Sequence, residues 1–136
     1  MQSKSSGFTL LELLVVIVII GLLAGYVAPR YFSQVGRSEI QVARAQIESL
    51  EKALDQYRLD TRNYPSTEEG LEALVAKPAS AQAWQGPYLK KAVPTDPWGR
   101  PYVYRTPGEK GEFQVLSYGR DGKPGGSGED ADIGAQ

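Results

Sequence analysis

The side chains best suited to chemistry in this 136-residue chain are carboxylates, because the chain contains neither Cys nor His. Without those two residue types there is no thiolate nucleophile, no disulfide and no zinc finger, and the commonest general base is missing. Glu12 lies near the start of a long apolar run, whereas Asp121, Glu129, Asp130 and Asp132 lie in a glycine-rich C-terminal segment. These two segments are the candidate functional sites.

Glu12 occupies a position where a charge is costly. The apolar run that follows it extends to Ala28, and residues 8–28 would span about 31 Å as a helix, close to the ~30 Å hydrocarbon core of a bilayer. An unpaired carboxylate in such a segment costs roughly a few kcal/mol. We therefore expect residues 8–28 to form a transmembrane helix and Glu12 to have a partner.

Two simpler explanations account for the N-terminus only in part. A secretory signal peptide would use Lys4 as its basic residue, but its apolar core would be about 7–15 residues long, shorter than this run, and would not contain Glu12. An ordinary signal anchor explains the length of the run and Lys4, but it leaves Glu12 without a role.

The segment Gly7-Phe8-Thr9-Leu10-Leu11-Glu12, placed before an apolar run, resembles the processing site of type IV pilins and pseudopilins. The resemblance implies that a membrane prepilin peptidase removes residues 1–7 as a leader and that Phe8 becomes the N-methylated first residue. Glu12 is then fifth in the mature chain, at the position of the family's characteristic Glu. We expect its carboxylate to pair with the Phe8 ammonium of a neighbouring subunit in a filament, because two buried charges are tolerable only when paired.

The chain beyond the apolar run has the periodicity of an amphipathic helix. Apolar residues recur at spacings of three and four from Ile40 to Tyr57, which predicts a helix to about Leu59 with one face packed on the protein's own sheet. Pro29 is expected to kink or locally open this helix. Ser66 and Glu69 have capping-box spacing, which predicts a second, short helix ending at residues 77–78.

Two strands are expected in the C-terminal half, at residues 101–105 and 113–118, because both runs are rich in β-formers. Residues 106–111 contain Pro and Gly and predict the hairpin turn between them. Residues 79–99 read as a loop whose aromatic side chains fasten it to the core. The expected fold is α+β: a long N-terminal helix packed on a small antiparallel sheet.

The acidic, glycine-rich C-terminus has two readings from its chemistry alone. Such a composition is typical of a solvated, flexible tail. It also suits a calcium loop, because Ca²⁺ binds carboxylate and carbonyl oxygens and glycines allow a short loop to wrap an ion. The spacing is not that of an EF-hand, which would place acidic or amide residues where this chain has Lys123 and Gly125.

Five further segments resemble the major, G-type pseudopilins of bacterial type II secretion systems, namely residues 63–66, 70–74, 86–91, 96–99 and 116–122. The resemblance implies one structural Ca²⁺ in the C-terminal loop. The ligands that it implies are the side chains of Asp121, Asp132 and Asp130, main-chain oxygens near Tyr118 and Lys123, and an oxygen of Ser127.

The resemblance also implies a structural subunit and no enzyme, without catalytic residues. Residues 29–136 would form a periplasmic domain, anchored in the bacterial inner membrane by residues 8–28 and polymerising into a periplasmic pseudopilus that helps to drive folded proteins through the outer membrane. The implied partners are further copies of the chain, the prepilin peptidase, minor pseudopilins and an inner-membrane assembly platform. Nucleic acid is not expected, because the net charge is −1 and there is no basic stripe.

Two alternatives remain open at the level of sequence. A type IV pilin for adhesion or motility would share the N-terminal motif, although many such pilins close a C-terminal loop with two Cys, which this chain lacks. A membrane-anchored enzyme would need a positioned pair of carboxylates with tuned pKa values, and Asp130 and Asp132 lie in a glycine-rich tail that contains no nucleophile.

Overall fold

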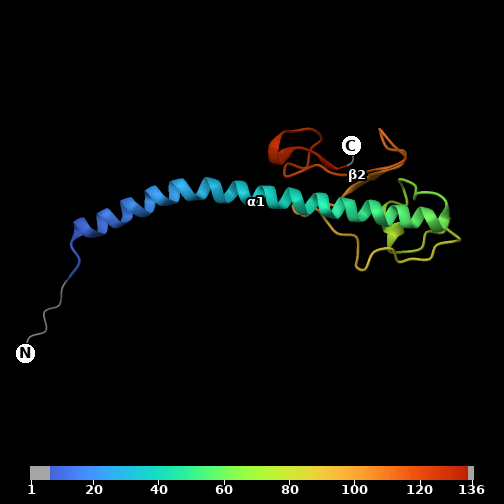
Figure 1. Ribbon diagram of the computed structural model, residues 1–136, viewed down its shortest axis with the longest axis horizontal. Helices are drawn as coiled ribbons and strands as arrows, with labels where there is room; N and C mark the ends of the chain where they lie inside the picture. The colour runs from blue at the N-terminus through green and yellow to red at the C-terminus, as the bar shows by residue number, and fades with distance from the viewer. Residues whose placement is uncertain (1–6, 135–136) are drawn as a thin grey trace, which may run out of the picture. The chain divides into compact units, whose positions relative to one another are not determined.

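The structure is a computed structural model that describes residues 7–134. Six of the seven residues of the expected leader, residues 1–6, lie outside the described part, and only Gly7 is inside it. The chain divides into two compact units, residues 1–36 and 37–136. Helix α1 (Leu10–Thr61) contributes to both units, and every other element belongs to the second (Figure 1).

Helix α1 is helical at every residue from Leu10 to Thr61, including Pro29. Pro29 removes one backbone donor, but the helix does not open there, so this part of the expectation was wrong. The C-terminal end lies two residues beyond the expected Leu59. There Arg62 adopts a left-handed conformation with φ 70°, and its N–H donates to the carbonyl of Arg58 over 2.7 Å. A left-handed residue of this kind ends many helices.

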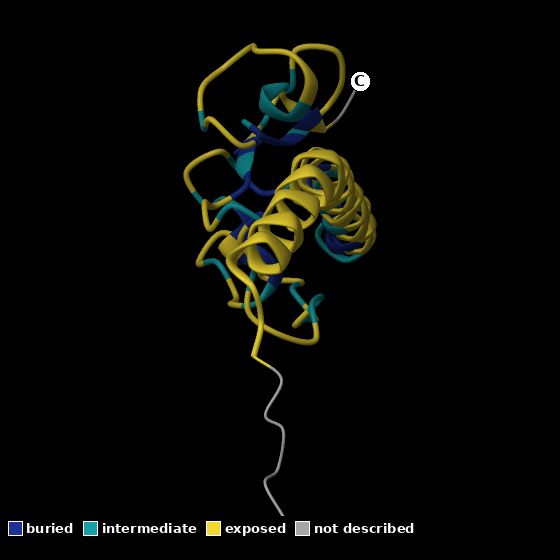
Figure 2. Cartoon of the chain, turned by 90° about the vertical axis from the view of Figure 1, so that its left-hand side faces the viewer, coloured by how far each residue is buried: buried dark blue, intermediate teal, exposed yellow. Residues whose placement is uncertain are grey.

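The two halves of α1 differ in what surrounds them. All residues from Gly7 to Val35 are exposed, and the N-terminal turns are exposed on every side (Figure 2). In the second unit the helix buries one stripe, formed by residues at spacings of three and four, namely Ala43, Ile47, Leu50, Leu54 and Tyr57. The amphipathic reading of this half is therefore confirmed.

The sheet has three antiparallel strands in the order β1 (Val103–Arg105), β2 (Gln114–Ser117) and β3 (Ile133–Gly134). The expected hairpin is β1–β2, with Val103 opposite Leu116. Strand β3 was not expected from the sequence, because it has only two residues and one of them is glycine. Gly134 is required there, since a Cβ at this position would lie 2.4 Å from the carbonyl oxygen of Val115.

The expected second helix is only partly present. The capping pair forms in both directions, with Glu69 N–H donating to Ser66 Oγ at 3.1 Å and Ser66 N–H to the Glu69 carboxylate at 3.0 Å. Gly70 then takes φ 63°, and the chain continues as the short 3₁₀-helix η1 (Leu71–Leu74). The short helix ends at Leu74 and not at residues 77–78 as expected, and the left-handed Gly70 interrupts the turn that the capping pair begins.

The core of the second unit lies between the buried stripe of α1, helix η1 and the sheet. Two aromatic residues of the long loop pack against it, as expected: Trp84 donates through Nε1 to the carbonyl of Ala73 (2.7 Å), and Tyr88 donates through its hydroxyl to Asp60 (2.7 Å). These contacts hold the loop that leads to strand β1.

Candidate functional site

The N-terminus of α1 is built around Thr9 and Glu12. The backbone N–H of Glu12 donates to the hydroxyl oxygen of Thr9 over 3.1 Å, and the N–H of Leu13 donates to the Thr9 carbonyl over 3.2 Å. Thr9 therefore caps the helix, and Glu12 lies at the third helical position, the spacing of a capping box. A carboxylate in the first turn is stabilised by the positive end of the helix dipole.

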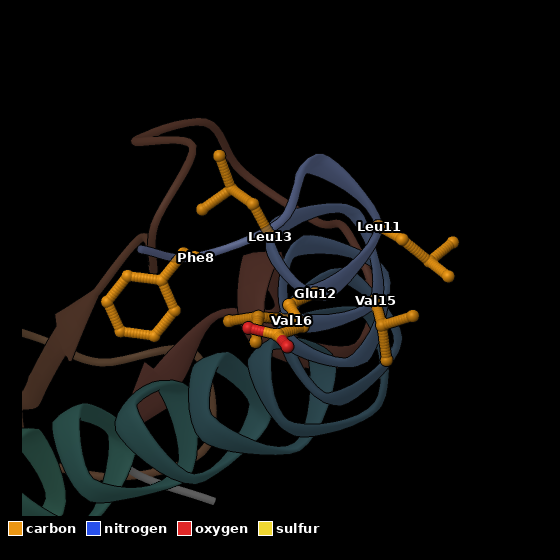
Figure 3. A pocket seen from close by; sticks show the side chains of 6 residues that line it. All are labelled: Phe8, Leu11, Glu12, Leu13, Val15 and Val16. Carbon is orange, nitrogen blue, oxygen red and sulfur yellow. The ribbon is translucent and has the colours of Figure 1, made fainter. Parts of the chain in front are cut away.

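The surroundings of Glu12 are apolar. Glu12 lines a shallow depression together with Phe8, Leu11, Leu13, Val15 and Val16, and its carboxylate points to the same side as the Phe8 ring (Figure 3). The Phe8 side chain is 91% exposed. Within residues 7–134 no Arg or Lys forms an ion pair with Glu12. The carboxylate thus lies in the first turn of the helix, and no Arg or Lys of the described residues forms an ion pair with it.

The expected processing point, between Gly7 and Phe8, lies immediately before α1. Both residues are exposed and belong to no helix or strand. The part of α1 that follows is long and apolar enough to cross a membrane, and none of its most apolar stretch is buried in the structure. A signal sequence would meet the same criteria of length and composition, so the membrane span of residues 8–28 stays a prediction.

The C-terminal loop, residues 118–134, carries the expected calcium ligands. Their carboxylates differ in whether they form an ion pair. Asp121 accepts the N–H of Lys123 (3.1 Å), and Asp132 accepts the N–H of Gly125 (3.0 Å). Within residues 7–134 neither carboxylate is paired with an Arg or Lys. The Asp121 charge nevertheless contributes to raising the pKa of the Arg120 guanidinium.

Asp130 differs from Asp121 and Asp132 because it forms an ion pair with Arg120. The Arg120 side chain donates to Asp130 Oδ1 at 3.0 Å and to Glu129 at 2.6 Å, and these hydrogen bonds and charges raise the pKa of the Arg120 guanidinium. Sequence reasoning did not foresee this ion pair. No group of three or more acidic side chains among residues 7–134 is close enough to hold a metal by itself.

The remaining expected ligands, Tyr118, Lys123 and Ser127, lie in the same loop. Tyr118 directly follows strand β2 and accepts a hydrogen bond on its hydroxyl from Arg105 (3.0 Å). Lys123 lies in the turn after Asp121. Ser127 precedes the 3₁₀-helix η2 (Gly128–Asp130), and its hydroxyl makes no capping hydrogen bond.

A buried carboxylate that sequence reasoning missed lies beside this loop. Asp96 is 4% exposed and accepts hydrogen bonds from the N–H groups of Trp98 (3.1 Å) and Arg100 (2.8 Å) and from the Ser117 hydroxyl (2.7 Å). Burial, and to a smaller degree the Asp96 charge, raises the pKa of Tyr102 to about 12. The sequence Asp-Pro-Trp-Gly indicates a turn. It does not indicate that Asp96 accepts a hydrogen bond from Ser117 of β2.

Two family models match the chain. The prokaryotic N-terminal methylation motif matches residues 2–28. This range includes Glu12, its capping residue Thr9 and the exposed apolar start of α1. The model of type II secretion system protein G matches residues 30–136. The chain belongs to the type II secretion system protein G family, a family of structural pseudopilins, and the resemblance seen in its sequence is confirmed.

Individual relatives agree with this assignment. The chain is 50% identical to the type II secretion system core protein G of Pseudomonas aeruginosa, over 98% of this chain and 96% of that protein. It is 47% identical to the core protein G of Vibrio cholerae, over 96% and 91%. Among solved structures it matches the major pseudopilin from the type 2 secretion system of enterohaemorrhagic Escherichia coli, with TM-score 0.65 and 36% identity over 76% of this chain and 90% of that one.

These matches bear on the choice between a secretion pseudopilin and a type IV pilin, which the sequence left open. The α+β fold, with one long helix packed on a small antiparallel sheet, is that of the solved pseudopilin. The family assignment favours a secretion pseudopilin over a type IV pilin for adhesion or motility. An N-terminal apolar helix in a pseudopilin is consistent with anchoring in the inner membrane.

Proposed function

We propose that this chain is a non-enzymatic subunit that is stored in the bacterial inner membrane, with residues 29–136 in the periplasm, and polymerises into the periplasmic pseudopilus of a type II secretion system. Growth of that filament would help to drive folded proteins through the outer membrane. The observation that carries the proposal is the apolar half of α1, exposed at every residue from Gly7 to Val35, with a carboxylate at its start. Such a surface needs either lipid or neighbouring helices around it.

The proposed assembly contact joins Glu12 to the N-terminus of another copy. Removal of residues 1–7 by the prepilin peptidase creates an amino group on Phe8. A chain-terminal amino group ordinarily has a pKa of about 7.7–8.0 and is therefore largely protonated near neutral pH. In an apolar filament core, that ammonium and the Glu12 carboxylate would each be costly alone and tolerable as a pair. The pair would set the register between subunits, as a buried polar residue does in a coiled coil.

The test of this contact is the behaviour of Glu12→Ala and Glu12→Leu in cells that carry the secretion system. Both variants are expected to insert into the membrane as well as the unchanged chain and to give little or no pseudopilus. Glu68→Ala, which removes an exposed carboxylate outside the apolar helix, is the matched control and should assemble normally. Normal filament yield from the Glu12 variants would contradict the proposal.

Processing is tested separately by mass spectrometry of the protein purified from membranes. The expected mass corresponds to the loss of residues 1–7 and one methyl group on Phe8. A chain that retains residues 1–7, or that is cut after Ala28 as a secreted protein would be, would contradict the proposed storage in the membrane.

We also propose that the C-terminal loop binds one Ca²⁺. Asp121 and Asp132 supply hard carboxylate oxygens that form no ion pair within residues 7–134, and the Ser127 hydroxyl makes no capping bond. With main-chain oxygens of Tyr118 and Lys123 these groups form the type of oxygen set that Ca²⁺ prefers. Asp130 would join only by giving up its ion pair with Arg120. The ion would fasten a loop that has little apolar content.

The calcium proposal is tested by thermal unfolding of the full chain in detergent, with Ca²⁺ and with a chelator. At a free concentration of about 100 times Kd, Ca²⁺ should add about 2.7 kcal/mol of stability. Asp121→Ala and Asp132→Ala should abolish that gain, whereas Glu109→Ala, an exposed acidic residue of the β1–β2 turn, should keep it. Equal melting temperatures with and without Ca²⁺ would refute the site.

A further inference from the structure

The turn at residues 96–100 is attached to the start of the C-terminal loop by two separate side chains. The first is Asp96, which closes its own turn and accepts the Ser117 hydroxyl of β2. Ser117 is 1% exposed, and its oxygen in turn accepts the N–H of Gly119 over 3.2 Å. The turn is therefore joined through Ser117 to the first residues of the loop.

The second attachment is the guanidinium of Arg100. Its Nη1 donates to the carbonyl oxygens of Gly119 and Arg120, each at 3.1 Å. Within residues 7–134 Arg100 forms no ion pair, whereas Arg120 is held by two carboxylates. The partners of Arg100 are thus two successive peptide carbonyls, and the residue that follows them is Asp121.

Gly122 shows how closely the guanidinium fits against the loop. A Cβ on Gly122 would lie 2.5 Å from Arg100 Cζ and 2.6 Å from its Nε. Real Cβ atoms essentially never show non-bonded contacts this short, so any larger residue at position 122 would displace the arginine or the loop. Arg100 therefore contacts the chain on both sides of Asp121, at residues 119–120 and at residue 122.

These contacts fix the backbone on which the Asp121 side chain is carried. The orientation of a peptide unit is set by the direction of its carbonyl, and Arg100 holds both units that precede Asp121. Flexible, glycine-rich segments lose much conformational freedom when they bind a ligand. A loop held in this way before the ion arrives would have less freedom to lose.

We propose that Arg100 is a positioning residue for the calcium site: it holds the peptide units at residues 119–120 so that Asp121 is placed for the ion before the ion binds. This inference rests on the calcium proposal above. Arg100 does not touch the ion. It acts through the backbone of the loop and would raise the affinity of the site for Ca²⁺ without changing the set of ligands.

The experiment measures the Kd for Ca²⁺ by calorimetry on the full chain in detergent, at a temperature well below unfolding. Arg100→Ala is expected to weaken binding roughly tenfold, because the two peptide units before Asp121 would then be ordered only when the ion binds. Arg100→Lys keeps the positive charge but loses the planar guanidinium. Its Kd for Ca²⁺ should lie between those of the unchanged chain and of Arg100→Ala. Arg37→Ala, an exposed arginine in α1 far along the chain from the loop, is the matched control and should bind as the unchanged chain does.

A double substitution separates positioning from general loss of stability. Gly122→Ala should weaken Ca²⁺ binding because its Cβ displaces the guanidinium, and because φ 68° strains any residue other than glycine. In the Arg100→Ala background only the strain remains, so Gly122→Ala should cost less there. Equal costs in the two backgrounds would overturn the proposal.

The Kd values of the unchanged chain and of the Arg100 variants separate the calcium proposal from the role of Arg100. If the unchanged chain binds no Ca²⁺, the calcium proposal fails and this inference fails with it. If the unchanged chain binds Ca²⁺ and Arg100→Ala binds it with the same Kd, only the role of Arg100 is overturned, even where that variant melts at a lower temperature. If Arg100→Ala does not fold, the intermediate Kd expected of Arg100→Lys decides the question, and an unchanged Kd in that variant overturns the role.

Discussion

The hydroxyl oxygen of Thr9 accepts the backbone N–H of Glu12 over 3.1 Å, and this bond caps α1, which begins at Leu10, two residues after Phe8. Cleavage after Gly7 would leave the cap intact at the very start of the chain. The cap also places Glu12 in the first helical turn, where the helix dipole stabilises a negative charge. The cost of a carboxylate in an apolar segment is therefore reduced within the subunit itself, before any neighbour pairs with it.

Thr9→Ala should destabilise the first turn of α1 by about 1 kcal/mol, because the Glu12 N–H loses its acceptor. Hydrogen exchange of the Glu12 and Leu13 amides in the full chain in detergent is the measurement, and both amides should exchange faster. Thr9→Ser keeps the hydroxyl and should exchange at the original rate. Faster exchange in the serine variant as well would show that the methyl group, rather than the cap, holds the turn.

Asp96→Ala should lower the free energy of unfolding of the second unit by about 3 kcal/mol, because the N–H groups of Trp98 and Arg100 and the buried Ser117 hydroxyl lose their acceptor. Asp96→Asn keeps one oxygen for the two backbone donors, and the Ser117 hydroxyl can turn to accept from the new amide, so a loss of about 1 kcal/mol is expected. Urea unfolding monitored by tryptophan fluorescence measures both. Equal losses for the two variants would contradict this account of the site.

The raised pKa of Tyr102 predicts a loss of stability at alkaline pH. Its pKa is raised from 10.0 to about 12 in the folded protein, chiefly by burial. Below pH 10 the folded and unfolded chains both keep the proton. Between pH 10 and 12 the unfolded chain releases it first, so stability falls as the pH rises.

Tyr102→Phe removes this titration and should flatten the fall in melting temperature between pH 10 and 12, measured against the unchanged chain. At neutral pH the variant should be about 1 kcal/mol less stable, because Tyr102 no longer donates to Gln46. The same slope in both chains would mean that Tyr102 titrates normally in the folded protein.

The buried stripe of α1 supplies a matched pair of leucines. Leu54 is 0% exposed and Leu59 is 77% exposed, five residues further along the same helix. Leu54→Ala should cost about 2–5 kcal/mol through lost burial and the cavity it leaves, whereas Leu59→Ala should change stability by no more than about 0.5 kcal/mol. Urea unfolding measures both, and similar losses would contradict the packing of α1 on the sheet.

The expected second helix shows why local signals were not always sufficient. Ser66 and Glu69 form the capping pair that their spacing predicted, because both partners are three residues apart. Whether an α-helix followed depended on Gly70, whose left-handed conformation ends the turn and directs Leu71 and Leu74 into the core. That choice is made by burial against α1 and the sheet, which no short-range pattern records.

What the sequence by itself determined are the features that depend on residues near one another in the chain. These are the apolar segment with Glu12 at its start, the amphipathic stripe of α1 and the β1–β2 hairpin, and they were enough to indicate the family. Only the tertiary structure decided the partners of Asp96, Arg100 and Asp130, and the pairing of β3 with β2. The physical reason is that a carboxylate or guanidinium accepts many partners, and the folded backbone selects which of them, often about twenty residues away, comes within hydrogen-bonding distance.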